Sequence, residues 1–428
     1  MSNLKKLAED IAKLDDGLSA CMKCGTCQSV CPIFAETMKE SDVARGKLAL
    51  LSNLSKSIAT DAKGVRERLD RCLLCGSCQA ACPSGVKILD IFMKAREISA
   101  ITMGLNPIKK LIFRMMLCHP KLFAFLTEFS APFRKIFMRP QKNAPDTCRA
   151  ILAEVVIGDR RLPVMPSQTI RQKYGNYSSA DKGSGLNVLF FPGCMGDKVY
   201  TNVTEACLKI FKHHGVGVVM PANMACCGIP ALASGDTQSL VKLAKINLDI
   251  FKNQKFDYII TACASCTETI AKLWAEYTDG EYKNLAEKFG AKTLDISAFL
   301  VDVLGVKASE IAQNAETITY HDSCHLSKAL GIKTQPREIL KASGVKLVEM
   351  PEADRCCGCG GSFTLTHYDL SRKIGQRKRD NILATGAKTV SAGCPACMMQ
   401  ISNMLALNED EVAVKHVVEI YANTLPND

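Results

Sequence analysis

The chain has 428 residues, 22 of them cysteine, and a formal net charge of +11. This length suits two to four domains, and the basic excess alone does not choose between a nucleic acid, an anionic membrane and an acidic partner. Residues 1–17 lack the apolar core of a secretory signal and fit an amphipathic helix, and no uncharged apolar run approaches the roughly 20 residues of a membrane span. We therefore expect a cytoplasmic protein whose clustered cysteines bind metal and do not form disulfides.

Two cysteine runs near the start, CMKCGTCQSVCP and CLLCGSCQAACP, share the spacing C-x2-C-x2-C-x3-C-P. Two-cluster bacterial ferredoxins use this run, and the fourth cysteine of each run ligates the other cluster. Residues 1–100 are therefore expected to form a two-cluster [4Fe-4S] ferredoxin-type domain. One cluster is assigned to Cys21, Cys24, Cys27 and Cys82, and the other to Cys72, Cys75, Cys78 and Cys31.

Zinc is the alternative for these runs. Zinc sites usually pair two short C-x2-C hairpins at a distance, so four cysteines in one run with a terminal proline favour iron–sulfur clusters. Between the runs, SDVARGKLALLSNLSKS has Leu and Ala at helical spacing, which predicts an inserted helix. This all-helical variant resembles the domain of succinate dehydrogenase iron–sulfur subunits.

A second repeat fills the C-terminal half. Each copy has one cysteine, then a cysteine pair, then C-x2-C, and the second copy follows the first by 130 or 131 positions throughout. A register kept over ten cysteines indicates a duplicated domain. The first set is Cys194, Cys226, Cys227, Cys263 and Cys266, and the second is Cys324, Cys356, Cys357, Cys394 and Cys397.

Short apolar strands such as NVLFFPGC and TITYHDSC lead into these cysteines and alternate with helical segments, which predicts parallel sheets. Ligands gather at the carboxyl ends of such strands, beside helix N-termini that favour an anionic thiolate cluster. Two adjacent thiolates fit one cluster if one bridges two irons, so the cluster is not expected to be a regular cube. The expected fold class is α+β and multidomain: a helical ferredoxin domain followed by two tandem α/β domains, residues 187–312 and 313–428.

Residues 101–186 separate the two repeats. Segment 106–140 is rich in Phe and Met, has seven Lys or Arg against one Glu, and is cut by prolines into predicted short helices. We expect this basic Phe-rich helical linker to dock on a partner subunit or a membrane surface, and packing as core with exposed charges is the alternative. Nucleic acid is not an expected partner.

The motifs C-x31-CC-x35-C-x2-C and C-x31-CC-x36-C-x2-C resemble the cysteine-rich CCG domain. That domain occurs in heterodisulfide reductase catalytic subunits, glycolate oxidase iron–sulfur subunits, anaerobic glycerol-3-phosphate dehydrogenase and lactate-utilisation proteins. The domain order and phrases such as RCLLCGSCQAACPSGVKILDI and GVGVVMPANMACCG most resemble the glycolate/lactate oxidase iron–sulfur subunit family. The resemblance implies one or two CCG clusters, of the noncubane [4Fe-4S] type, besides the two cubanes, with about sixteen irons if every site is filled.

The resemblance also implies an electron-transfer subunit of an FAD-dependent 2-hydroxy-acid dehydrogenase that acts on lactate or glycolate. No G-x-G-x-x-G opens a helix after a strand, so a separate FAD-binding dehydrogenase subunit is expected, with a quinone or another carrier as acceptor. The complex is expected in the cytoplasm, with the inner face of the cell membrane as an alternative. Both cysteine sets are complete, which favours a second hypothesis, a heterodisulfide-reductase-like subunit that cleaves a disulfide at its CCG clusters. A third is that one CCG domain has only a structural or docking role.

Other cysteines and histidines have simpler interpretations. Cys359 stands in the Gly-rich turn after the second pair and is expected to be merely small, and Cys118, Cys148 and Cys207 to be buried apolar residues. His321 and His325 flank Cys324 and suit a hydrogen bond to cluster sulfur or an ordinary satisfied position equally well.

Overall fold

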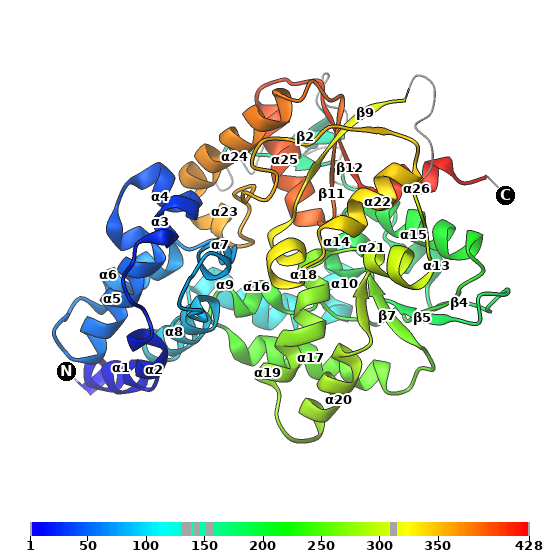
Figure 1. The fold of residues 1–428 in the computed structure, drawn as a ribbon. Coiled ribbons are helices and arrows are strands. Elements are labelled where there is room, and N and C mark those ends of the chain that lie inside the picture. The colour runs from blue at the N-terminus through cyan, green and yellow to red at the C-terminus, as the bar shows by residue number, and fades with distance from the viewer. Residues whose placement is uncertain (1, 130–137, 141–145, 151–157, 309–314, 427–428) are drawn as a thin grey trace. The chain divides into compact units, whose positions relative to one another are not determined.

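The computed structural model describes residues 2–129, 138–140, 146–150, 158–308 and 315–426 (Figure 1). The chain forms two compact units. The first consists of Met1–Met115, Ile229–Leu240 and Arg355–Gln376, and the second of Met116–Gly228, Val241–Asp354 and Arg377–Asp428. Each ferredoxin cysteine therefore belongs to the first unit, together with a short segment that follows Cys226–Cys227 and another that contains Cys356–Cys357.

Helices make up the ferredoxin part of the first unit (Figure 1). Its longer helices are α1 (Ser2–Ala12), α5 (Ala44–Ser55), α6 (Ala62–Asp70) and α8 (Ile88–Met103), and its shorter ones are α2 (Asp15–Ser19), α3 (Thr26–Val30), α4 (Pro32–Thr37), η1 (Glu40–Asp42) and α7 (Ser77–Ala80). Leu7, Ile11, Leu51, Leu69 and Phe92 are buried together in its core. The inserted helix predicted between the cysteine runs is confirmed as α5, whose Leu48, Leu51 and Leu54 face this core.

The first CCG repeat folds around a five-stranded sheet in the second unit, with the order β4-β6-β5-β7-β8. Its strands are β4 (Tyr177–Ser179), β5 (Asn187–Phe190), β6 (Gly217–Met220), β7 (Tyr258–Thr261) and β8 (Thr293–Asp295). The last four are parallel, as predicted, and β4 joins the edge antiparallel to β6. Its helices include α14 (Gly193–Lys198), α15 (Thr201–His213), α16 (Ile229–Leu232), α17 (Thr237–Phe251), α18 (Ala264–Glu268), η3 (Thr269–Leu273), α19 (Trp274–Tyr277), α20 (Gly280–Gly290), α21 (Ile296–Ala298) and η4 (Phe299–Val303).

The second repeat has a four-stranded sheet of order β10-β9-β11-β12, and every pairing in it is parallel. Its strands are β9 (Thr317–His321), β10 (Lys346–Leu347), β11 (Thr389–Ala392) and β12 (Ala413–His416), and its helices are η5 (His325–Ala329), α22 (Thr334–Ala342), α23 (Phe363–Thr366), α24 (Tyr368–Leu383), α25 (Pro395–Leu407) and α26 (Val417–Thr424). Both repeats therefore have the predicted strand–helix alternation and the predicted parallel sheets. Strand β10 has only two residues, which is shorter than the strand that the sequence suggested before Cys356.

The segment between the repeats is helical only in its first part. It forms α9 (Pro107–Lys110), η2 (Leu111–Leu117) and α10 (Pro120–Phe129), and then three short antiparallel strands, β1 (Met138–Pro140), β2 (Thr147–Ala150) and β3 (Arg161–Pro163), before α13 (Ile170–Tyr174). The prediction of a helical linker was therefore wrong where the described residues form β1, β2 and β3, while α13 is again helical. Among the helices that the structure describes, none is long and apolar enough to cross a membrane.

Candidate metal centres

The eight ferredoxin cysteines line two cavities in the first unit. One cavity is bordered by Cys21, Cys24, Cys27, Cys78 and Cys82, and the other by Cys31, Cys72, Cys75 and Cys78. Each cavity thus receives a cysteine from the opposite run, Cys82 in one and Cys31 in the other. This arrangement fits the crossed ligation expected from the spacing, which stays a prediction.

The two loops around these cavities have the same backbone conformation. Gly25 and Gly76 have φ angles of 88° and 74° and precede helices α3 and α7, and Lys23 and Leu74 also have positive φ angles, of 59° and 54°. Non-glycine residues rarely adopt this conformation, and each one costs about 1 kcal/mol or more. The resulting curvature lets the Leu74 N–H approach the Cys72 Sγ at 3.4 Å.

A buried cation lies beside the second cavity. The Lys47 side chain is only 2% exposed, donates a hydrogen bond to the Asp42 carbonyl oxygen and borders the same cavity as Cys31 and Cys72. Burial lowers the Lys47 pKa, and charge on Cys72 and Cys31 would raise it. Burial of a charged ammonium group away from water is unfavourable unless a negative charge lies beside it. The position of Lys47 therefore fits an anionic thiolate cluster in this cavity.

The thiols themselves also fit iron–sulfur ligation. All 22 cysteines are free, so none is used in a disulfide. Burial raises the pKa of Cys31 to about 11, so bound metal would have to displace its proton. Four converging thiols with backbone N–H groups aimed at sulfur are the donor set of a [4Fe-4S] cluster, which would supply one-electron transfer at this position.

The second ferredoxin loop contacts the segments that follow both CCG cysteine pairs, all within the first unit. Arg96 of α8 donates hydrogen bonds to the carbonyl oxygens of Cys72 at 2.7 Å and Ala233 at 2.5 Å. A Cβ on Gly360 would lie 2.6 Å from the Leu73 side chain, so only glycine permits that approach. Arg96 therefore bridges the loop to a residue six positions after Cys227, and Leu73 of the loop directly approaches a residue three positions after Cys357.

The first CCG set converges at the carboxyl ends of β5, β6 and β7 in the second unit. The Cys194 and Cys226 sulfurs are 3.8 Å apart, and those of Cys227 and Cys266 are 3.5 Å apart. Contacts with Cys227 and then Cys263, together with burial, raise the pKa of Cys266 well above its usual value. Cys226 also contacts Cys227, so the five thiols from three strand ends lie in one connected group, and their role as ligands stays a prediction.

Two buried side chains hold the backbone of this cysteine pair. The Asn247 side chain accepts from the Ala225 N–H at 2.8 Å and donates to the Cys226 carbonyl oxygen at 3.3 Å. The Trp274 indole N–H donates to the Cys227 carbonyl oxygen at 2.8 Å. Sequence reasoning missed both residues, although the single tryptophan of the chain was a signal worth following.

Two thiols of the second repeat, Cys394 and Cys397, connect to the first set within the second unit. Cys394 precedes α25 and Cys397 lies in its first turn, as Cys263 and Cys266 do for α18. Cys394 accepts hydrogen bonds from Cys263 and Cys397, which hold the pKa of Cys394 well below its usual range. Cys324 lies in the second unit, whereas Cys356, Cys357 and Cys359 belong to the first. The contact between Cys263 and Cys394 was not foreseen.

Two buried titratable groups occupy equivalent positions in the repeats. Asp295 ends β8 and caps α21 through the Ser297 N–H at 2.8 Å, and His416 ends β12 and caps α26 through the Val418 N–H at 3.3 Å. Burial raises the Asp295 pKa to about 7 and lowers the His416 pKa to about 4. The sequence analysis did not select either one, because strand-end caps are common and carry no metal-binding spacing.

The histidines beside Cys324 differ. His321 is fully buried, and neither ring nitrogen has a hydrogen-bond partner in the part of the chain that the structure describes. A ring nitrogen without a partner suits a contact with a cluster sulfur. His325 instead forms a hydrogen bond through Nδ1 with the carboxylate of Glu268 of the first repeat, which corresponds to the ordinary satisfied position.

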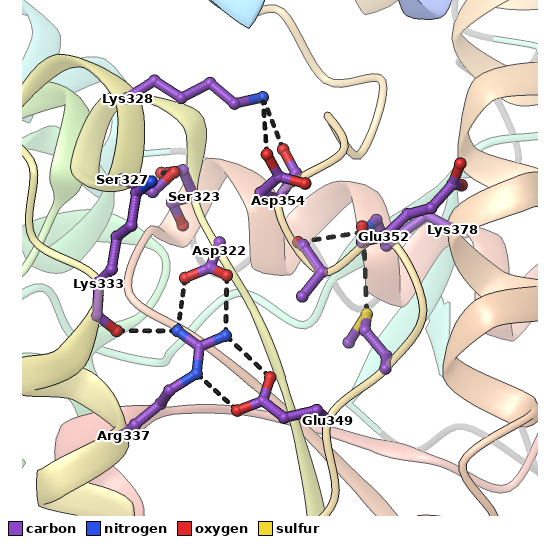
Figure 2. Close-up of polar contacts among 12 residues, drawn as sticks. Asp322, Ser323, Ser327, Lys328, Lys333, Arg337, Glu349, Glu352, Asp354 and Lys378 are labelled. Carbon is purple, nitrogen blue, oxygen red and sulfur yellow. Dashed lines mark hydrogen bonds and ion pairs between the residues drawn. The ribbon is translucent and has the colours of Figure 1, made fainter. Parts of the chain in front are cut away.

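Charged groups fix the loops near Cys324 (Figure 2). Arg337 pairs with both carboxylate oxygens of Asp322 and also with Glu349, and its guanidinium lies 5.1 Å from the Tyr320 ring centre. Lys378 donates to the carbonyl oxygens of Glu352 and Ala353. The loop that leads toward the second cysteine pair is therefore held from two helices, α22 and α24.

Family models match three parts of the chain. A 4Fe-4S dicluster domain matches residues 17–86, and a cysteine-rich domain named CCG matches residues 188–271 and 318–402. The fold and the cysteine sites thus define the class as a dicluster iron–sulfur protein with a duplicated CCG domain.

Relatives place the chain within that class. The probable glycolate oxidase iron–sulfur subunit of Bacillus subtilis is 27% identical over 91% of this chain and 89% of its own length. Lactate utilization protein A of an Exiguobacterium species is 31% identical over 55% of this chain and 96% of its own length. One subunit of the fumarate reductase (CoM/CoB) of Methanothermobacter marburgensis is 26% identical over 94% of this chain and 71% of its own. The chain belongs to the glycolate/lactate oxidase iron–sulfur subunit family.

Proposed function

We propose that this chain relays electrons from an FAD-binding subunit, which oxidises lactate or glycolate, to a quinone or another carrier. The observation that carries the proposal is the chain of thiol contacts from Cys227 through Cys266, Cys263 and Cys394 to Cys397. Metal centres bound at such neighbouring thiol groups can exchange single electrons directly, because no domain or carrier has to move between them. The relatives named as glycolate oxidase and lactate utilization proteins support the choice of substrate class.

The chain's own residues would position the carriers in this scheme. The loop conformation set by Gly25 and Gly76 directs thiols and N–H groups inward, and Lys47 offsets negative charge at the second ferredoxin site. Arg96 ties that loop to the segment after Cys227. The flavin chemistry, in which a hydride leaves the hydroxy acid, belongs to the partner subunit.

The test is purification of the native complex without oxygen, followed by addition of L-lactate or glycolate. We expect a flavoprotein to co-purify, about sixteen irons per chain if every site is filled, and loss of visible cluster absorbance when the substrate is added. An isolated chain with no flavoprotein partner and with its own disulfide reductase activity would contradict the proposal.

A second candidate is catalysis at the CCG sites themselves, with a disulfide as substrate. Complete cysteine sets in both repeats favour it. Electron paramagnetic resonance with and without a thiol distinguishes the two. A signal that appears only with thiol and is lost in Cys357→Ser supports disulfide chemistry. A spectrum that thiol does not change supports the relay.

A further inference from the structure

A hollow lined by lysines lies in the second unit, at the edge of the first CCG sheet opposite to the cysteines. Asn187 begins β5, Asp257 directly precedes β7 and Lys292 directly precedes β8, and all three border the hollow. These strands are parallel, so the hollow lies at their amino ends, whereas Cys194 and Cys263 follow the carboxyl ends of β5 and β7. We call it the lysine hollow, and the electron relay does not use this edge.

Three aromatic side chains border the lysine hollow and hold its shape. The ring centre of Phe289 lies 6.0 Å from that of Phe251 and 5.6 Å from that of Phe256. Phe251 and Phe289 are buried, and Phe256 is half-buried. The hollow therefore stands on core side chains that are packed against one another.

The side chains around the hollow are strongly basic. Four positive charges line it against the single negative charge of Asp257, and the cations are Lys252, Lys255, Lys288 and Lys292. Lys252 pairs with Asp249 at 2.6 Å. The other three lysines form no ion pair with an acidic side chain in the part of the chain that the structure describes.

Ring contacts position two of these ammonium groups. The Lys288 Nζ lies 5.9 Å from the Phe289 ring centre, and the Lys292 Nζ lies 5.7 Å from that of Phe256 and donates to the Phe256 carbonyl oxygen at 3.4 Å. Helices α17 and α20 also end here, and lysines often lie near helix C-termini. Each helix end carries only about half a negative charge. Positive charge therefore remains in excess after both helix ends and Asp257 are counted.

Size and residue type indicate the kind of ligand. The lysine hollow has a volume of about 590 Å³, within the range of roughly 300–1,000 Å³ that is typical of small-molecule sites. A concave site of this size suits a small molecule better than the surface of a folded partner. Lysine binds phosphate as a point charge, and no arginine, whose fork pairs with carboxylates, is among the described residues that line the hollow.

We propose that the lysine hollow binds a small molecule with two or three linked phosphate groups. Inorganic polyphosphates and nucleoside polyphosphates share this chemistry. The phosphate oxygens would accept hydrogen bonds from Lys255, Lys288 and Lys292, whose positive charges the ligand would neutralise. The site goes beyond the proposed electron relay and does not depend on it.

Calorimetric titration of the iron-loaded full chain at fixed ionic strength tests the site. We expect inorganic triphosphate to bind about tenfold more tightly than orthophosphate, because it has more negative charges for the same lysines. Lys255→Gln/Lys288→Gln changes two exposed side chains and should weaken triphosphate binding about tenfold or more. Lys255→Arg/Lys288→Arg should bind as the wild type does, since it keeps the charges.

A matched variant controls for net charge. Lys5→Gln/Lys6→Gln removes two exposed lysines from α1, in the first unit, and should leave triphosphate binding unchanged. All variants should keep the iron content and the visible spectrum of the wild type. An equal loss in the Lys5→Gln/Lys6→Gln variant, or no loss in Lys255→Gln/Lys288→Gln, would overturn the site.

Comparison of anions identifies the source of the phosphates. ATP that binds more tightly than triphosphate would support a nucleotide, and equal affinity would support binding through the phosphate chain alone. Citrate that binds as tightly as triphosphate would overturn the choice of phosphate over carboxylate. A hexaglutamate peptide that binds more tightly than triphosphate would overturn the small-molecule site in favour of an acidic partner segment.

Discussion

The guanidinium of Arg337 pairs with the carboxylate of Asp322 through two N–O distances of 2.8 Å each (Figure 2). Asp322 stands two residues before Cys324, and its side chain is 9% exposed. This pair therefore fixes the end of β9 where the second cysteine set begins. The hydrogen bonds that Arg337 donates to Asp322 and Glu349 also raise the pKa of Arg337, so its charge is permanent.

Removal of that partner should weaken the second repeat. Arg337→Met leaves a buried carboxylate alone, and we expect the free energy of unfolding to fall by about 3 kcal/mol. Chemical denaturation of the iron-loaded protein measures it. Lys13→Met removes a surface pair whose lysine is 75% exposed, and its unfolding free energy should stay close to that of the wild type. Equal small losses in both variants would show that the buried pair is unimportant.

Crossed ligation in the ferredoxin domain predicts which double variants act on one cluster. Cys24 and Cys82 border the same cavity, so Cys24→Ala/Cys82→Ala should remove about four irons per chain and leave the other cubane signal intact. Cys75→Ala/Cys82→Ala should disturb both cubanes, because Cys75 borders the other cavity. Iron analysis and paramagnetic resonance distinguish these results. The reverse pattern would mean that each run holds its own cluster.

Lys47 should tune one cubane and not the other. Loss of a buried positive charge stabilises the oxidised cluster relative to the reduced one, so Lys47→Met should lower the potential of the cluster at Cys31 and Cys72. The effect should be about 1–2 kcal/mol, or tens of millivolts. Redox titration followed by paramagnetic resonance measures it. The exposed Lys63→Met serves as the control, and an equal shift there would argue against a local charge effect.

Asp295 should make stability depend on pH. Its pKa is raised to about 7 in the folded chain by burial, against about 3.9 for an unfolded Asp, so the folded state binds more protons between these values. Stability should therefore fall as pH rises from about 4 to 7 and stay lower above 7. Asp295→Asn keeps the cap and removes the charge, so it should be more stable than the wild type at pH 8 by up to about 4 kcal/mol and similar at pH 4. Melting curves at both values decide it, and Asp257→Asn, at an exposed loop position, should lack this pattern.

Cysteine spacing and strand patterns were sufficient to predict the main architecture. Tight spacing in CMKCGTCQSVCP permits few loop conformations, and residues at equivalent positions, Lys23 and Leu74, adopt the same left-handed backbone. Strands ending at Cys194, Cys263 and Cys394 were recognisable because a parallel strand buried on both faces reads as an apolar run. At these positions the local sequence alone was enough to predict the loops and the strands.

Tertiary contacts account for what was missed. The hydrogen bond from Cys263 to Cys394 joins residues 131 positions apart, and nothing local to either predicts it. Beyond α10 the linker forms strands because Cys148 and its neighbours pair with β1 and β3, which outweighs the proline pattern. Burial is the largest cause of the shifted pKa values of His416 and Asp295, and a cap position in the sequence does not reveal that burial.

The chain's single tryptophan lies where one repeat holds its cysteine pair, with its indole N–H on the Cys227 carbonyl oxygen. Iron–sulfur clusters absorb light over the range in which indole emits. Insertion of iron into the first CCG site should therefore dim the intrinsic fluorescence of the protein, and loss of iron should restore it. The fluorescence of Trp274 should therefore report iron insertion beside Cys227 without any added dye.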